Sequence, residues 1–522
     1  MNNSMGAGVV MWVGVLLILL QGLSIQMLTA INGDVAFLLS MARNTGLQGF
    51  YAEFYEVNPP LIVYLYKIFL WPSHIGLNDI ASANISMTLY ILLSLVVASR
   101  NLIHLDSVLH VVLVWAFCVG LMSVSQTMFM QREHIIAAGL VVYVSSTLNK
   151  DGHRLIDIIW QGIAALLIAI SFALKPQYLL VLVLVETVVM VYHSTLVPRK
   201  LVLELVVLGG MYLTAINIFQ KEYFEFILPL ARDYYAGYFS SWQFLLSIVV
   251  AVLLCLVIPI RLLWVGGLDR KLVVVLCVTT LGCLLAFLIG RTGFGYHLIP
   301  TSVMFVTINV LAFVVGFKRF WLYRRLSTAL CLVSVILVLG VLTKLDYFRN
   351  YEVGYALSWK RLVGKLPKIE ETTLVESPKI TALANSIEPY VCEGESILFL
   401  AQRMYPHTLV AHSGMVWASR LPNFWLLPVA MENKGDARAD SVLDLVRNTL
   451  SEDIRNKEPI VIVIEHFDST NTYISNFDFL SFFLDASLFK QELQRYYLAD
   501  TLMSDNANFS IFVRKKHLCL SH

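Results

Sequence analysis

Long apolar runs separated by short polar loops fill the larger, N-terminal part of the chain. A membrane-spanning helix needs roughly 20 mostly apolar residues, fewer where neighbours anchor its ends. We count about eleven such runs. They lie at residues 9–30, 82–98, 108–129, 135–148, 158–174, 178–192, 201–219, 242–262, 272–289, 300–315 and 326–341. The apolar run at 61–71 is too short to cross, so we expect an interfacial or re-entrant helix there.

The pattern changes at residue 344, where polar residues become frequent. Short β-rich runs at 396–400, 459–464 and 509–514 alternate there with helical patterns such as 442–450. We therefore expect a transmembrane domain at 1–343 and a small α/β domain at 344–522. The tail has neither a G-x-G-x-x-G turn nor a phosphate-binding P-loop motif, so nothing in it indicates nucleotide binding.

Composition strengthens the membrane assignment. Hydrophobic residues make up 58% of the chain and charged residues 14%, which is far more apolar than a soluble protein. The formal net charge of +2 gives no bias toward nucleic acid, and we expect no nucleic-acid partner. The sequence thus predicts a polytopic α-helical membrane protein with a C-terminal α/β domain.

Basic residues indicate the orientation, because Lys and Arg resist translocation. If the N-terminus is inside, every cytoplasmic loop carries basic charge, at Arg100; Lys150 and Arg154; Arg199 and Lys200; Arg261, Arg270 and Lys271; and Lys318, Arg319, Arg324 and Arg325. The opposite loops hold scattered single cations. An odd number of spans then places the α/β domain outside, on the same side as the loops that follow the first, third, fifth, seventh and ninth spans.

The cysteines argue against a zinc ribbon or a redox motif, because none of the seven forms a C-x-x-C pair. Five of them lie in apolar runs. Only Cys392 and Cys519 lie in the polar tail, where they could form a disulfide if the tail faces an oxidising compartment.

The first outer loop carries several polar side chains that could serve a reaction. Asp34 follows Gly33 directly at the end of the first span, where a carboxylate could face a cavity and act as a base. A solvated helix end is the alternative. Further along are Glu53, Glu56 and Asn58, followed by a Pro-Pro pair that could simply end one segment and begin the next.

The second outer loop, Gln131-Arg132-Glu133-His134, is squeezed between two apolar runs. Ionisable residues are costly near hydrocarbon unless they are paired or face water. A structural Arg132–Glu133 ion pair is one interpretation. An anion-binding Arg132 beside an acidic or metal-binding partner is the other.

Single cations mark two further outer loops. Lys175 lies at a tight turn, where it could extend to the interface or bind phosphate. Arg291 belongs to a glycine-rich loop that ends in Tyr296 and His297, and such a backbone can fold closely around a ligand. A lone His in such a place is more often a structural residue than a ligand. Glu186, inside the sixth run, is either functional or a hydrogen-bonded structural carboxylate.

These features together resemble a known family. Asn58-Pro59-Pro60-Leu61, the 131–134 motif and Tyr296-His297 look like motifs of bacterial GT-C membrane glycosyltransferases, a group that includes protein O-mannosyltransferases and the lipid A aminoarabinose transferase. An acidic residue after the first span, a long first loop, many spans and an external C-terminal domain also match. The resemblance implies an enzyme of the bacterial inner membrane that works on the extracytoplasmic face.

The resemblance also implies a reaction and its participants. Such enzymes move a sugar from a polyprenyl-phosphate carrier to an acceptor with inversion, and the first-loop acid, here Asp34, acts toward the acceptor. The acceptor would be a glycan, a lipid or a protein. Substrate-binding roles are expected from Glu53, Glu56, Asn58, Arg132, Glu133, Lys175, Arg291, Tyr296 and His297.

Metal binding is a further expectation, with departures from the family pattern. Candidates for holding a divalent ion are Glu56, Glu133, His134 and His297. The family often has a second acid directly after the first, where this chain has Val35, and the aminoarabinose transferase has Glu-Lys-Pro-Pro where Glu56 here is displaced by one position.

Two other functions compete with the enzyme. One is a transporter or flippase of a lipid-linked glycan, which would usually show repeated halves and broken helices. The other is a membrane scaffold without catalysis. Neither the sugar nor the acceptor can be read from the residues.

Overall fold

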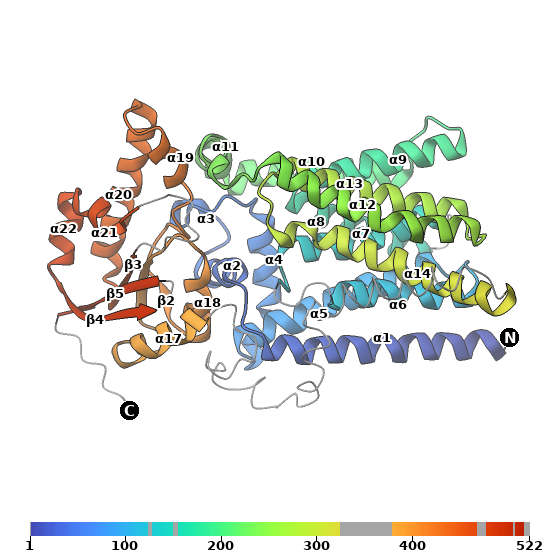
Figure 1. Cartoon of the computed structure of the whole chain (residues 1–522), viewed down its shortest axis with the longest axis horizontal. Coiled ribbons are helices and arrows are strands. Elements are labelled where there is room, and N and C mark those ends of the chain that lie inside the picture. The colour runs from blue at the N-terminus through green and yellow to red at the C-terminus, as the bar shows by residue number, and fades with distance from the viewer. Residues whose placement is uncertain are drawn as a thin grey trace. The chain divides into compact units, whose positions relative to one another are not determined.

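Apolar helices dominate the computed structural model, which describes residues 2–123, 128–149, 155–323, 378–466, 477–504 and 507–515. Eight helical segments among these residues are long and apolar enough to cross a membrane. They belong to α1 (Asn2–Leu28), α5 (Asp79–Asn101), α8 (Leu155–Leu174), α9 (Leu179–His193), α10 (Lys200–Phe219), α12 (Trp242–Val265), α13 (Arg270–Gly290) and α14 (Ile299–Tyr323) (Figure 1). The polytopic α-helical fold is therefore confirmed.

Four other predicted apolar runs have different outcomes. The runs at 108–129 and 135–148 correspond to the 17-residue helices α6 (Ser107–Ser123) and α7 (Arg132–Leu148). The short run at 61–71 forms α4 (Leu61–Phe69) and the 3-10 turn η1 (Trp71–Ile75). The eleventh predicted span, 326–341, lies outside the described residues, as does the predicted domain boundary at 343.

The chain divides into two compact units. The membrane unit consists of Met1–Met27, Ala83–Leu213 and Ser240–Ser358. The α/β unit consists of Leu28–Ser82, Thr214–Phe239 and Trp359–His522. Two loops from the N-terminal part of the sequence thus belong to the same compact unit as the C-terminal sheet.

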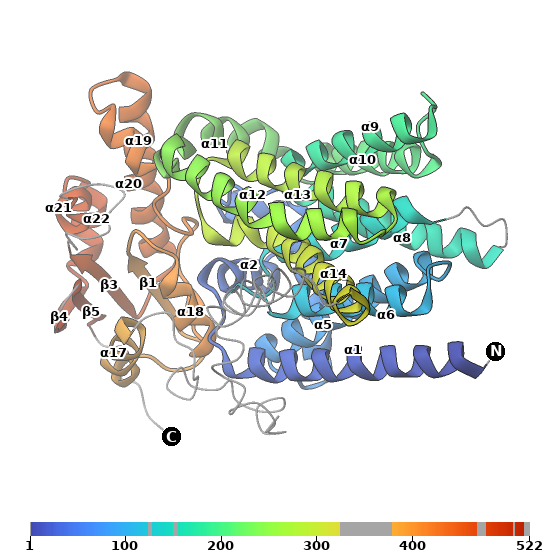
Figure 2. The ribbon, with the colours of Figure 1, turned by 45° about the vertical axis from the view of Figure 1, so that its right-hand side comes forward.

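Helix α7 lies at the centre of the membrane unit, whose helices run alongside one another (Figure 2). Every α7 residue except Ser146 is buried. Gly139 brings α7 close to α8, because a Cβ there would lie 1.8 Å from Ser171 Oγ and 2.9 Å from the Leu167 carbonyl oxygen. Small residues at helix contacts allow this kind of close backbone approach in membranes. Polar side chains at the start of such a buried helix must find partners inside the protein.

A five-stranded sheet with the order β2-β1-β3-β5-β4 forms the core of the α/β unit. Strands β1 (Ser396–Leu400), β2 (Val416–Trp417) and β3 (Val461–His466) are parallel, and β5 (Ala507–Arg514) pairs antiparallel with β3 and with β4 (Tyr496–Ser504). The expected alternation of strands and helices is confirmed. The helices of this unit are α2 (Gly33–Asn44), α3 (Phe50–Glu53), α4, α11 (Leu228–Tyr234), α17 (Pro378–Ile387), α18 (Tyr405–His412), α19 (Leu427–Glu432), α20 (Ala437–Lys457), α21 (Phe479–Leu484) and α22 (Ser487–Leu493).

Gln220 joins the two N-terminal loops of the α/β unit to each other. Its side-chain oxygen accepts a hydrogen bond from the Phe50 amide at 3.0 Å, and its amide nitrogen donates to the Leu47 carbonyl at 3.1 Å. Tyr55 packs its ring on Phe226 with centroids 5.1 Å apart. Phe226, an aromatic residue of the 214–239 segment, therefore packs inside this unit.

Cys392 of the α/β unit is disulfide-bonded. The partner expected from the sequence, Cys519, lies outside the described residues. Among the cysteines of the membrane unit, Cys118, Cys255, Cys277 and Cys283 carry free thiols.

His407 makes the stability of the α/β unit depend on pH. It is 2% exposed on α18, and its Nε2 lies 2.6 Å from the Pro422 carbonyl oxygen. Burial lowers the pKa of His407 from 6.5 to about 4, and the hydrogen bond to Pro422 opposes this shift. Unfolded chains therefore bind a proton between these two values while the folded unit does not, and stability falls as the pH falls through this window.

We predict that the free energy of unfolding falls by about 3 kcal/mol from this group alone between pH 7 and pH 4. Urea titrations followed by tryptophan fluorescence at pH 7, 6, 5 and 4 measure it. A His407→Gln variant should be less stable at pH 7 but should show a shallower pH dependence. If the free energy of unfolding of His407→Gln depended on pH as steeply as that of wild type, His407 would not be the source of the pH dependence.

Candidate functional site

Three ionisable side chains from separate elements meet in the membrane unit. Glu133 lies in the first turn of α7, Lys175 precedes the turn η2 (Pro176–Tyr178), and His297 lies in the turn η5 (Gly295–Leu298). Lys175 Nζ forms an ion pair with Glu133 Oε1 and lies 2.9 Å from His297 Nε2. His297 Nε2 also lies 3.2 Å from Glu133 Oε1. Because their exposed side-chain fractions are 0% for Glu133, 12% for Lys175 and 7% for His297, these charges are largely shielded from solvent.

Neighbouring groups fix the orientation of the His297 ring. Thr292 Oγ1 lies 2.9 Å from Nδ1, and the Tyr178 hydroxyl donates to the His297 carbonyl oxygen at 3.2 Å. An ammonium group can only donate, so His297 Nε2 accepts from Lys175 and the ring proton is assigned to Nδ1, which donates to Thr292. The imidazole is thereby held neutral with its basic nitrogen toward Lys175.

Aromatic side chains pack beside this cluster. Lys175 Nζ lies 5.8 Å from the centre of the Tyr296 ring, within the range of a cation–π interaction. Tyr296 meets His297 edge-on at 4.4 Å, and Phe294 stacks on Tyr296 at 5.5 Å. Tyr296 and His297, predicted as site residues, are thus brought together with Lys175.

The start of α7 retains hydrogen-bonding capacity that the described part of the chain does not use. Glu133 Oε2 has no hydrogen-bond partner there, although the side chain is completely buried. Met130, just before the helix, has φ +66°, a backbone conformation that costs a non-glycine residue on the order of 1–3 kcal/mol. Buried polar atoms of this kind usually contact a water or a ligand.

Two cationic side chains act on Glu133. Arg132 is buried, with 7% exposure, and acts electrostatically on Glu133 together with Lys175. The assigned His297 tautomer adds no charge. The predicted Arg132–Glu133 relation is therefore present as electrostatic coupling, while Glu133 forms a direct ion pair with Lys175, 42 residues away. Ammonium and guanidinium groups brought together in this way can bind an anionic ligand.

Arg291 lies at the C-terminal end of α13. Its guanidinium is 4.7 Å from the centre of the Trp242 ring, and its carbonyl oxygen accepts from the Ser240 amide at 2.7 Å. Its φ of +53° turns the chain out of the helix. The residue therefore stacks on an aromatic side chain at the entrance to α12.

The site residues predicted in the first loop belong to the α/β unit. Asp34 is half-buried in the first turn of α2, and the Asn32 side chain caps this helix by accepting from the Asp34 amide at 3.0 Å. Glu56 is buried and holds Asn58 through its backbone amide at 3.0 Å and its side-chain amide. Glu53 is exposed at the end of α3.

The Asn-Pro-Pro-Leu segment has a local structural use. Pro60 is the N-cap of α4, in agreement with the expectation that the proline pair could begin a segment. Glu56, two residues before Asn58, accepts the bonds that close the turn ahead of this helix. The turn at Glu56 and Asn58 and the helix start at Pro60 thus account for the order of these residues in the sequence.

The candidate metal ligands do not form a metal site. No group of three or more His, Cys, Asp or Glu side chains suited to a metal ion is found in the described ranges. Glu133 and His297 do meet, but the Lys175 ammonium bridges them where a cation would have to lie. His134 instead packs edge-on against Phe129 at 5.0 Å, with its Nδ1 accepting from the Met130 amide at 3.4 Å. A divalent ion does not fit this arrangement.

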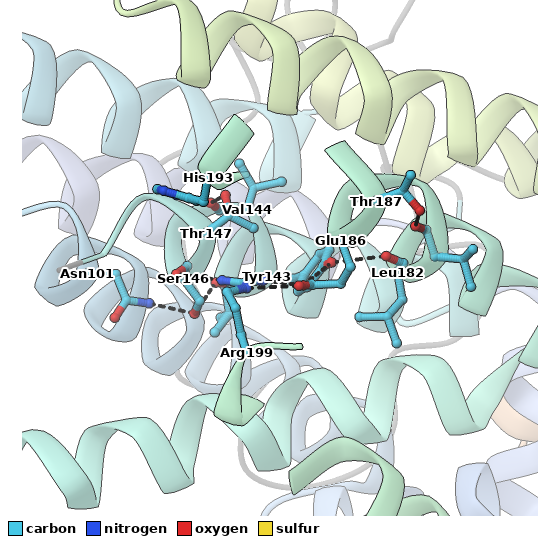
Figure 3. A network of polar contacts seen from close by, with 12 residues as sticks. Asn101, Tyr143, Val144, Ser146, Thr147, Leu182, Glu186, Thr187, His193 and Arg199 are labelled. Atoms are coloured by element: carbon cyan, nitrogen blue, oxygen red, sulfur yellow. Dashed lines mark hydrogen bonds and ion pairs between the residues drawn. The ribbon is translucent and has the colours of Figure 1, made fainter. Parts of the chain in front are cut away.

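Glu186 has a structural network of its own, drawn in Figure 3. Arg199 Nε donates to Glu186 Oε2 at 3.0 Å and Arg199 Nη2 to Oε1, while the Tyr143 hydroxyl donates to Oε1 at 2.8 Å. Arg199 Nη1 also reaches the Ser146 carbonyl oxygen at 3.1 Å. The Glu186 carboxylate is thus neutralised and accepts bonds on both oxygens, which favours the structural interpretation.

Sequence reasoning missed several partners of the site residues. Tyr178 and Thr292 hold His297, and Arg199 and Tyr143 hold Glu186. The only signal for Arg199 was its place in a basic loop 13 residues after Glu186. Tyr178 and Thr292 gave none, because isolated hydroxyl residues beside apolar runs are common.

We predict that Glu186→Gln destabilises the membrane unit by about 3 kcal/mol, because it leaves the Arg199 charge buried without its counter-ion. Thermal melting in detergent, followed by size-exclusion fluorescence, measures the loss. Replacing both partners, as Glu186→Leu with Arg199→Met, should recover most of it. The control is Thr187→Val on the exposed side of α9. Equal melting temperatures for Glu186→Gln and the Thr187→Val control would contradict a stabilising role of the Glu186–Arg199 ion pair.

Comparisons with known proteins give a structural relative. No family model matches the sequence, and no curated protein matches it. The crystal structure of ArnT from Cupriavidus metallidurans bound to undecaprenyl phosphate is similar, with a TM-score of 0.55, 14% identity, and coverage of 97% of this chain and 98% of that one. The chain therefore shares the fold of that ArnT structure over 97% of its length.

Proposed function

We propose that this protein is an inverting glycosyltransferase that moves a sugar from a polyprenyl-phosphate carrier to an acceptor on the extracytoplasmic face of the bacterial inner membrane. The observation that carries the proposal is the buried Glu133–Lys175–His297 cluster. Its Lys175 ammonium, together with the nearby Arg132 guanidinium, supplies the donors that the phosphate of such a carrier needs. The fold agrees, because ArnT shares it and its crystal structure is bound to undecaprenyl phosphate.

The reaction assigns a separate task to each group. Asp34 takes the proton of an acceptor hydroxyl as the acceptor oxygen forms its bond to the anomeric carbon. The bond from that carbon to the phosphate oxygen breaks, and the electron pair leaves with the polyprenyl phosphate. Lys175 and Arg132 stabilise the charge that develops on this phosphate, where exclusion of water makes the interaction stronger. A single displacement inverts the anomeric centre.

The Glu133 carboxylate holds the Lys175 ammonium in place before the carrier binds. His297, kept neutral by Thr292, shares the same ammonium. Both contacts restrict the Lys175 side chain before the anion arrives. Less conformational entropy is therefore lost when the anion binds. Positioning the ammonium is the role we assign to these two residues.

The rival functions find less support. A pure scaffold gives no reason to place Arg132 and Lys175 together beside one buried carboxylate. A flippase would be expected to carry polar or broken helices at mid-membrane, and the one carboxylate suspected there, Glu186, is neutralised by Arg199. The acceptor class, whether glycan, lipid or protein, is left to the experiment.

We expect Asp34→Asn to lower turnover by about 10²–10⁴-fold, the usual contribution of a general base. The assay incubates purified protein in lipid with a panel of polyprenyl-phosphate sugars and candidate acceptors, and follows donor consumption. The matched control is Asp233→Asn, an exposed aspartate of the α/β unit. Turnover by Asp34→Asn equal to that of wild type would refute the assignment of the base.

A double variant tests the cation. Glu133→Gln with Lys175→Gln removes one positive and one negative charge together, so the net charge of the region is unchanged and the fold should persist. We expect binding of undecaprenyl phosphate, followed by native mass spectrometry, to weaken at least tenfold. Lys221→Gln, at an exposed lysine of the α/β unit, serves as control. Unchanged binding in the double variant would place the phosphate elsewhere.

A further inference from the structure

The segment that carries Asp34 is attached to the C-terminal part of the α/β unit. The Ile31 amide donates to His412 Nε2 at 3.2 Å, and Thr408 Oγ1 donates to the Ile31 carbonyl oxygen at 2.9 Å. These groups are buried, and both partners lie on α18. The start of α2 therefore takes its position from a helix that lies more than 370 residues later in the chain.

Packing strengthens this attachment on the next turn of α2. The Phe37 ring lies 4.8 Å from the His407 ring, and His407 in turn lies 4.0 Å from the Trp417 ring of β2. All three side chains are at most 5% exposed. The contact thus extends from α2 through α18 to the edge of the sheet.

Gly33 makes the closest approach. A Cβ on Gly33 would lie 2.2 Å from the Met404 carbonyl oxygen and 2.6 Å from the Met404 carbonyl carbon. Real Cβ atoms essentially never come so close, and backbone atoms cannot turn away as a flexible side chain can. Gly33, the residue just before Asp34, is therefore in direct contact with the loop that follows β1.

Glu465 fixes that loop. Its Oε2 accepts from the Gln402 amide at 3.2 Å, and its Oε1 accepts from the Tyr405 hydroxyl at 3.2 Å. Glu465 belongs to β3, the neighbour of β1. Contacts therefore run without a break from the sheet through the 402–405 loop to Gly33.

The topology of the sheet makes this location meaningful. From β1 the chain passes through α18 to β2 on one side, and later reaches β3 on the other side of β1. The carboxyl ends of β1 and β3 thus flank a topological switch point, the place where open α/β sheets bind their ligands. Here the loop at that place supports the start of α2.

We propose that the C-terminal α/β domain positions Asp34 for the acceptor, with Gly33 and Glu465 as the positioning residues. The inference rests on the proposed function, in which Asp34 is the base. The domain holds the backbone on either side of the carboxylate through Ile31, Gly33 and Phe37. Geometry sets the efficiency of proton transfer, and a displacement of about 1 Å can cost roughly 10²-fold in rate.

Gly33→Ala tests the proposal, because the added Cβ would lie too close to Met404 and the start of α2 would have to shift. We expect kcat per folded molecule to fall at least tenfold and the acid limb of the pH–rate profile to shift. The melting temperature should fall as well, since overpacking costs about 1–3 kcal/mol, while binding of undecaprenyl phosphate by the folded protein should stay within error of wild type. Gly46→Ala is the matched control, since a Cβ at Gly46 in the same first loop meets nothing within 4 Å.

A second variant, Glu465→Gln, tests the link between the sheet and this loop. The amide nitrogen of a glutamine cannot accept one of the two hydrogen bonds that Gln402 and Tyr405 donate to Glu465. We expect a smaller loss of kcat, with faster hydrogen exchange in residues 31–37.

Wild-type kcat and pH profile in Gly33→Ala would overturn the positioning role while leaving the proposed function intact. A loss of activity only in proportion to a loss of folded protein would overturn it too. Absence of turnover in wild type with every donor and acceptor would overturn both.

Discussion

The membrane unit depends on the neutralisation of charge at the buried start of α7. A carboxylate with no exposed surface is tolerated only where cations and hydrogen-bond donors converge on it. Glu133 therefore constrains Lys175 and His297 to one location, and with them the turns η2 and η5 that begin α9 and α14. The starts of α7, α9 and α14 are thus held together by one cluster of ionic contacts.

The second ionic contact of the membrane unit has a different character. Glu186 and Arg199 satisfy each other, and Tyr143 completes the set. Its carboxylate oxygens both accept bonds, whereas Glu133 keeps one oxygen unused in the described structure. Two buried glutamates in similar surroundings thus differ in the one property that matters for binding, namely unused hydrogen-bonding capacity.

Sequence patterns predicted much of the fold, because apolar periodicity and β-rich runs report burial directly. The strand at 396–400 and the apolar helices were found in this way. The direct partner of Glu133 could not be found, because the adjacent Arg132 was the obvious candidate and Lys175 lies 42 positions away. Nor could local patterns show that Gly33 touches Met404, because that contact joins distant segments through the backbone. Residue types marked the site, while their pairing required the three-dimensional structure.

The contact between Ile31 and His412 also has a consequence for biosynthesis. The two residues are 381 positions apart, so the segment that bears Asp34 emerges from the ribosome long before its support exists. At 5–20 residues per second, the interval is roughly 20 to 80 s. During that time the chain can insert its helices into the membrane, but the carboxylate has no fixed position. The support for the start of α2 is thus complete only after residue 412 has been synthesised, when the described helices of the membrane unit have already been made.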